Sequence, residues 1–167
     1  MSSKPSSVLI ADDSALLRQI VSDILAQSEE FVVAGFAADG HEAIRMVHEL
    51  EPDIVTLDVE MPGLDGLHAL GYIMSEAPRP VIVLSALDAH HGAALAIRAL
   101  ELGALEFVRK PAGREARHDD GAALALPLLE ALRTAAAANV LGTRVLARPQ
   151  LQPPSGARPT TTAAIVV

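Results

Sequence analysis

Residues 54–62, IVTLDVEMP, place an aspartate directly after a short apolar segment. The run from Ile54 to Leu57 is short and contains β-branched residues, as is typical of a buried strand, whereas Pro62 favours a turn. Asp58 is therefore expected at the carboxyl end of a strand. Open α/β sheets bind their ligands at this end of the strands, so the position is a candidate for chemistry.

The same arrangement occurs twice more in the chain. Asp12 and Asp13 follow the apolar run Val8 to Ile10, and Lys110 follows the run Phe107 to Val108. If these runs are parallel neighbouring strands, the polar residues behind them converge at one edge of a sheet. We therefore predict a site built from three carboxylates and one ammonium group.

Helices are predicted between the apolar runs. Ser14, Asp39 and Asp65 are suited to cap a helix N-terminus, and apolar residues recur at three- and four-residue spacing after each of them. Further strands are expected at Phe31 to Ala37 and at Val81 to Leu84. This alternation predicts an α/β fold, a (βα)5 doubly wound parallel sheet with helices on both faces.

The pattern changes after the fifth strand. A last helix is indicated by apolar residues at helical spacing, namely Leu128, Leu129, Leu132 and Ala136. Pro127 is expected near the first turn of this helix, where proline is tolerated. From Asn139 the composition shifts to Pro, Gln, Arg, Thr and Ser, as is typical of a linker.

The predicted organisation is one domain at residues 7–138, a linker at 139–162, and the start of a further domain at 163–167. The last five residues, AAIVV, are apolar again. They fit either the opening strand of a truncated second domain or a frayed tail, and we favour truncation.

Composition excludes several function classes. The net charge of -8 argues against DNA or RNA as a partner, because a phosphate backbone requires clustered Lys and Arg. Cysteine is absent, so disulfides and thiolate metal sites are excluded. No uninterrupted apolar stretch is long enough for membrane insertion, and the short N-terminal segment leaves no room for a signal peptide. We expect a cytoplasmic protein.

The three carboxylates require a cation. Two like charges about 4 Å apart repel by roughly 4 kcal/mol at an effective dielectric constant near 20. Oxygen-only ligands favour Mg²⁺, and Lys110 supplies a second positive charge. Such a site suits phosphoryl transfer in which Asp58 attacks phosphorus to form an aspartyl phosphate and Ser85 donates a hydrogen bond to it.

Each of these signals also has a structural interpretation. An Asp-Asp pair after a strand commonly serves turn formation and helix capping, a Lys-Pro pair is usually solvated, and Ser85 is suited to a local turn. His90 and His91 are neighbours on a predicted helix and point in different directions, so they are not expected to form a metal site. The functional interpretation depends on the polar residues lying at the ends of different strands.

Taken together, these residues resemble the receiver domain of two-component response regulators, which has a flavodoxin-like fold. The resemblance implies that Asp12 and Asp13 are the acidic pair of that family and Asp58 its phosphoacceptor. The other positions that it implies are a catalytic lysine at Lys110, a hydroxyl at Ser85, an aromatic switch at Phe107, and a metal ligand at the backbone carbonyl of Glu60.

The sequences of three segments resemble more specifically the receiver of the chemotaxis protein-glutamate methylesterase family. These segments are residues 11–18, ADDSALLR, residues 56–62, TLDVEMP, and residues 98–104, RALELGA. Two positions depart from that pattern, since Leu64 stands where methionine is common and Ala86 where a second serine is usual. The resemblance also raises a cis Lys110-Pro111 bond as an expectation, against a base rate of about 5–6% for X-Pro bonds.

The resemblance implies a chemotaxis histidine kinase as phosphate donor and a C-terminal effector domain, a protein-glutamate methylesterase and glutamine deamidase. That domain would act on methylated chemoreceptors. Its Gly-x-Ser-x-Gly nucleophile turn would lie beyond Val167, so these 167 residues are not expected to hydrolyse esters.

Three alternatives remain. One is a stand-alone receiver that acts as an interaction module or phosphate sink. Another is a phosphohydrolase of small phosphate esters, although such enzymes use Asp-x-Asp after the first strand. A transcription factor would need a basic helix-turn-helix region after the receiver, and the tail offers none.

Overall fold

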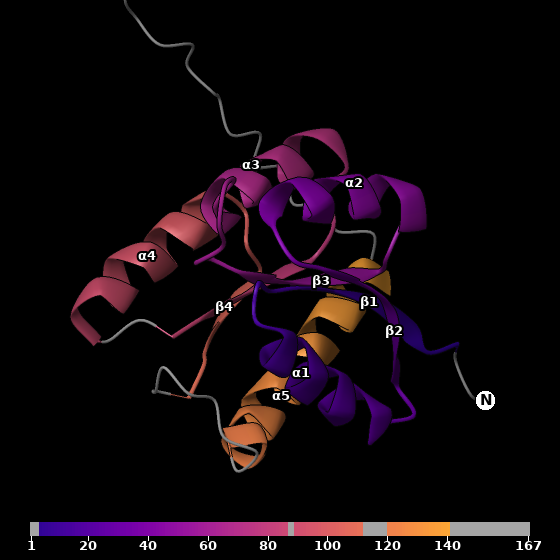
Figure 1. Cartoon of the computed structure of the whole chain (residues 1–167). Coiled ribbons are helices and arrows are strands. Elements are labelled where there is room, and N and C mark those ends of the chain that lie inside the picture. Colours follow the sequence, from indigo (N-terminus) through magenta and orange to yellow (C-terminus); the bar gives the residue numbers. More distant parts are fainter. Residues whose placement is uncertain (1–3, 87–88, 112–119, 141–167) are drawn as a thin grey trace, which may run out of the picture.

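The computed structural model describes residues 4–86, 89–111 and 120–140, which form a five-stranded parallel sheet between two layers of helices (Figure 1). The strand order is β2-β1-β3-β4-β5. The elements in chain order are β1 (Ser6–Ala11), α1 (Ala15–Ala26), β2 (Phe31–Ala37), α2 (Gly40–Leu50), β3 (Ile54–Asp58), α3 (Gly66–Glu76), β4 (Val81–Ser85), α4 (Ala89–Glu101), β5 (Glu106–Arg109) and α5 (Asp120–Val140). The predicted (βα)5 doubly wound fold is confirmed.

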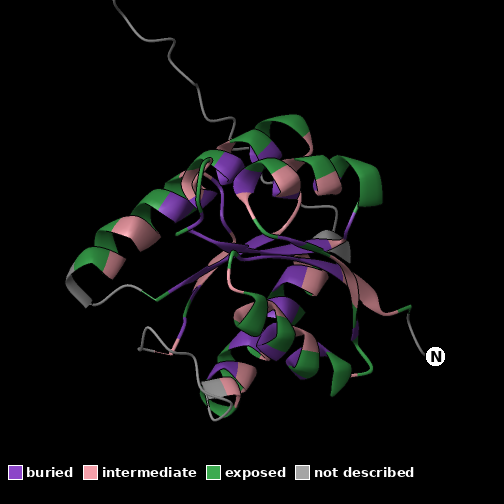
Figure 2. Cartoon of the chain, in the orientation of Figure 1, coloured by how far each residue is buried: buried purple, intermediate pink, exposed green. Residues whose placement is uncertain are grey.

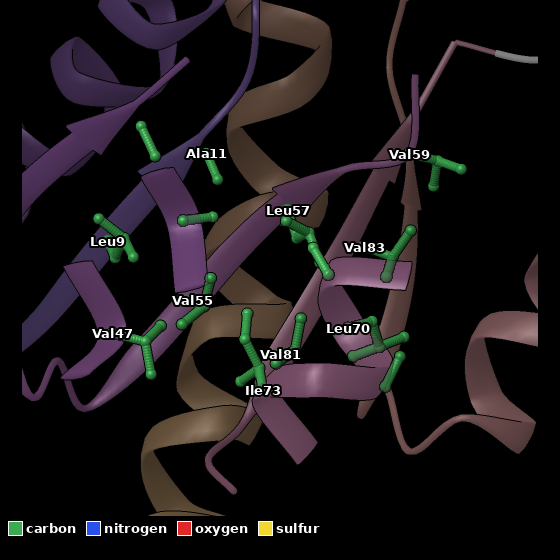
Figure 3. Close-up of a cluster of buried hydrophobic side chains, with 14 of the residues drawn as sticks. Leu9, Ala11, Val47, Val55, Leu57, Val59, Leu70, Ile73, Val81 and Val83 are labelled. Carbon is green, nitrogen blue, oxygen red and sulfur yellow. The ribbon is translucent and has the colours of Figure 1, made fainter. Parts of the chain in front are cut away.

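The two faces of the sheet carry separate apolar cores. Helices α2, α3 and α4 cover one face, and α1 and α5 cover the other (Figure 1). Alternate residues of a strand point to opposite faces, so Leu9 packs with Leu57 and Leu70 beneath α2 and α3 (Figure 3), whereas Ile10 packs with Leu128 beneath α5. Strands β3 and β4 are buried along their whole length (Figure 2), as expected for parallel strands covered on both sides.

The predicted N-caps of three helices are confirmed. The side chain of Ser14 accepts a hydrogen bond from the Leu17 backbone N–H at 3.3 Å. Asp39 accepts from the Glu42 N–H at 2.8 Å, and Asp65 caps α3 in the same way. These caps satisfy N–H groups that have no partner within their own helix.

Helix α5 differs from the prediction at both ends. It begins at Asp120, so Pro127 lies in its interior rather than near its first turn. Pro127 is exposed, and so is Ala123, the residue four positions earlier whose carbonyl loses its helical donor. The helix also continues to Val140, two residues past the predicted domain end. The rest of the predicted linker and the segment 163–167 lie outside the described residues.

Helix α5 also has the length and composition of a membrane span, over Gly121–Ala138. Its apolar side, however, packs into the domain, since Leu124, Leu128 and Leu132 are buried against the sheet and α1. Its outer side carries the charged residues Glu130 and Arg133. This arrangement is that of a core helix in an α/β domain.

The expectation of a cis Lys110-Pro111 bond is wrong. The described residues contain no cis peptide bond, and this one is trans. The trans form is the lower in free energy for an X-Pro bond by about 0.5–1 kcal/mol.

Candidate functional site

Side chains from three strand ends meet at the carboxyl edge of the sheet. Asp12 follows β1, Asp58 ends β3, and Lys110 follows β5, as the parallel arrangement predicts. Carboxylate oxygens of Asp12, Asp13 and Asp58 all lie within 4.8 Å of one another. Within the described parts of the chain, this is the one cluster of three acidic or histidine side chains that could hold a metal ion.

Lys110 bridges the two buried carboxylates. Its Nζ lies 2.5 Å from Oδ2 of Asp12 and 2.9 Å from Oδ2 of Asp58. Asp12 and Asp58 are 2% and 3% exposed and Lys110 is 7% exposed, so water screens these charges weakly. One ammonium group therefore offsets part of the repulsion between two acids that are almost fully desolvated.

The electrostatic environment disfavours the ionised form of Asp58. Burial raises the pKa of Asp58 to about 6, against the attraction of Lys110, and the neighbouring Asp12 carboxylate adds to the rise. The backbone N–H of Glu60 donates to Oδ1 at 3.1 Å and stabilises the charged form. Any further cation placed beside this buried carboxylate would stabilise its ionised form.

Asp12 is held at each of its polar groups but one. Its Oδ1 accepts from the Ser14 N–H at 2.9 Å, its backbone N–H donates to Ala37 at 3.0 Å, and its carbonyl accepts from Arg18 Nη1 at 2.6 Å. Its Oδ2 makes no hydrogen bond within the described residues, because its close approach to Lys110 has the distance of an ion pair without hydrogen-bond geometry. A buried anionic oxygen with spare lone pairs, next to two more carboxylates, fits a divalent cation.

The metal ligands that the resemblance implied stand as follows. Asp13 is the exposed member of the acidic cluster. Glu60 lies two residues after Asp58, and its backbone N–H already contacts that side chain, which places its main chain beside the cluster. Among the side chains that the structure describes, the cluster contains no histidine. His91 lies exposed on α4, and the side chain of His90 is outside the described structure.

Ser85 and Phe107 lie on one face of the sheet, because Phe107 pairs with Val83 and Ser85 follows Val83 by two residues on the same strand. Ser85 is fully buried at the end of β4, one position beyond Leu84, the register partner of Asp58. Its backbone carbonyl accepts from the Lys110 N–H at 2.7 Å. Phe107 pairs with Val83 and is half-buried in the core cluster beneath α4.

Two positions that support the site were not singled out in the sequence. A Cβ atom added to Gly66 would overlap the carbonyl oxygen of Asp58, so only glycine allows α3 to approach the end of β3 this closely. The N–H of Gly66 donates to Val59 at 3.0 Å. The turn sequence MPGLDG hinted at the first position, whereas nothing local indicated that Arg18 would bond to Asp12.

Comparison with known proteins gives one consistent result. The family model described as "Response regulator receiver domain" matches residues 8–119. A protein-glutamate methylesterase/protein-glutamine glutaminase of Caldanaerobacter subterraneus is 51% identical over 106 residues, which are 64% of this chain and 29% of that protein. The chain thus spans about three-tenths of the length of this curated relative.

Solved structures agree with the sequence relatives. The response regulator domain of Thermotoga maritima CheB superposes with a TM-score of 0.74 at 42% identity, covering 80% of this chain and 97% of that one. A chain of the CheX-CheY-BeF3-Mg+2 complex from Borrelia burgdorferi superposes with a TM-score of 0.63 at 33% identity, covering 78% and 88%.

Proposed function

Because the chain belongs to the response regulator receiver domain family, we propose that Asp58 accepts a phosphoryl group from a histidine kinase in the presence of Mg²⁺. Protein-glutamate methylesterases are among the relatives that match, so the phosphorylated domain is proposed to control such an effector within a longer protein. The observation that carries the proposal is the meeting of three carboxylates and Lys110 at one sheet edge.

The proposed step transfers a phosphoryl group from a donor atom to a carboxylate oxygen of Asp58. An oxygen of Asp58 forms a bond to phosphorus, and the bond from phosphorus to the donor's nitrogen, or to the oxygen of an acyl phosphate, breaks. The product is an aspartyl phosphate, and the donor leaves with the electron pair. With a pKa of about 6, Asp58 is mostly ionised at neutral pH and can act as nucleophile.

The residues around Asp58 supply charge and orientation. Asp12, Asp13, Asp58 and the Glu60 carbonyl would hold Mg²⁺, which neutralises charge on the phosphoryl oxygens when bound. Lys110 offsets the charge of the incoming group, and Ser85 is proposed to donate its hydroxyl proton to a phosphoryl oxygen. A structural relative is described in complex with both BeF3 and Mg+2, which supports the same metal here.

Phosphorylation is proposed to act on the effector through Ser85 and Phe107. An aspartyl phosphate adds dianionic charge and acceptor oxygens that attract the Ser85 hydroxyl. We propose that this movement opens space for Phe107, which lies on the same sheet face and is half-buried, so that one of two packings beneath α4 is favoured. The effector would then act on methylated chemoreceptors from the cytoplasm.

A small acyl phosphate tests the central step without a kinase. We expect intact-mass spectrometry to show one added phosphoryl group per chain when the protein is incubated with acetyl phosphate and Mg²⁺, and none for Asp58→Asn. Asp23→Asn is the matched control, because Asp23 is an exposed acid on α1 outside the cluster. Modification of Asp58→Asn at the same rate, or sustained turnover of varied phosphate esters, would contradict the receiver function.

A further inference from the structure

We infer that Arg18 is a positioning residue for the metal site, a role that rests on the proposed function. Arg18 lies on α1, one turn after the N-cap, and its Nη1 donates to the Asp12 carbonyl oxygen at 2.6 Å. Among the described residues this is the one hydrogen bond of its side chain. The guanidinium group therefore donates to a backbone carbonyl rather than to a carboxylate.

The carbonyl that Arg18 contacts has few alternatives. Asp12 lies between the end of β1 and the start of α1, and within the described structure Arg18 is the one hydrogen-bond donor to its carbonyl. The residue is 2% exposed, so water reaches it poorly. An unsatisfied buried carbonyl is unfavourable, and loss of Arg18 would favour rotation of this peptide group.

Rotation of that peptide group would misplace Asp13. The Asp12 carbonyl and the Asp13 N–H belong to one planar peptide unit, so turning that unit changes the backbone angle φ of Asp13 and with it the direction in which the Asp13 side chain leaves the main chain. Asp13 has no anchor of its own, because no hydrogen bond or ion pair engages its exposed side chain within the described residues. By contrast, Asp12 has contacts besides that with Arg18, since its side chain accepts from the Ser14 N–H and pairs with Lys110.

Arg18 thus holds the two acids of one loop in a common geometry. Groups that orient metal ligands in this way typically change metal affinity by 10- to 100-fold when they are removed. Within the described residues Arg18 makes no hydrogen bond or ion pair with Asp58 or Lys110, so its removal is expected to act on metal affinity and to spare the transfer step once the metal is bound.

The test separates metal affinity from phosphorylation rate. We expect Arg18→Met to raise the dissociation constant for Mg²⁺ about tenfold, measured from the rise in melting temperature with Mg²⁺ concentration. The rate of Asp58 phosphorylation by acetyl phosphate at saturating Mg²⁺ should stay within about twofold of wild type. Arg18→Lys keeps a donor and a charge, and it should recover most of the affinity.

Arg45→Met is the matched control, since Arg45 pairs with Glu42 and Glu49 on the exposed face of α2. If Arg18→Met does not fold, Arg18→Ala, which also lacks a donor, replaces it with the same expected loss. Unchanged Mg²⁺ affinity, or a lower saturated rate at normal affinity, would overturn the inference. Absence of Mg²⁺ binding or phosphorylation in the wild type would instead overturn the proposed function.

Discussion

Replacing Asp58 by asparagine is expected to stabilise the metal-free protein. Burial raises the pKa of Asp58 from 3.8 in a freely solvated chain to about 6 in the fold. The folded protein therefore binds more protons than the unfolded chain between these two pH values, and stability falls as pH rises through that window. Asparagine copies the size and neutral state of the protonated carboxyl group, so it removes this loss.

The magnitude follows from the size of the shift. About two pKa units at about 1.4 kcal/mol each give Asp58→Asn roughly 3 kcal/mol of added stability at pH 7.5. At pH 4.5 most of the native Asp58 is protonated, and the advantage should shrink to about 1 kcal/mol. The measurement is urea unfolding of both proteins at the two pH values, in buffer with a chelator to remove divalent cations.

Two controls sharpen this experiment. The two proteins should have the same denaturant slope, so that the midpoints report stability. Asp23→Asn, at an exposed position of α1, should show no pH-dependent gain. Added Mg²⁺ should stabilise the wild type more than Asp58→Asn and so reduce the difference in unfolding free energy between the two proteins. Equal stability of the two proteins at pH 7.5, or a difference that does not vary with pH, would refute the burial argument.

Three further predictions concern the support of the site. Gly66→Ala should destabilise the protein by about 1–3 kcal/mol in urea unfolding, because its Cβ would overlap the main chain of Asp58. The control Gly71→Ala, whose Cβ meets nothing within 4 Å, should stabilise the protein by about 0.5–1 kcal/mol. Equal effects of the two substitutions would contradict the close contact at Gly66. Lys110→Met should cost about 3–5 kcal/mol of stability in the metal-free protein and slow phosphorylation by acetyl phosphate, because two buried carboxylates lose their cation. An unchanged melting temperature would argue against the ion pairs. Phe107→Ala should leave the rate of phosphorylation intact yet blunt the response of an attached methylesterase in an activity assay, and an equal response in both proteins would remove the proposed switch.

The positions of the candidate site could be predicted because strand ends are marked locally. A short β-branched run followed by Asp58 identifies a buried strand and its carboxyl end without knowledge of any distant residue. Repetition of that pattern, with helices between the strands, restricts the topology to a doubly wound parallel sheet. The convergence of Asp12, Asp58 and Lys110 follows from this topology, and the structure confirms it.

Other features arise only when distant segments pack. The pKa of Asp58 depends on how completely helices and loops exclude water from the strand end, and local sequence does not encode that exclusion. The bond from Arg18 to Asp12 and the close approach at Gly66 depend on the seating of α1 and α3 against the sheet. Periodicity specifies which residues face a core, but the distances across it are set by the packing of all the elements at once.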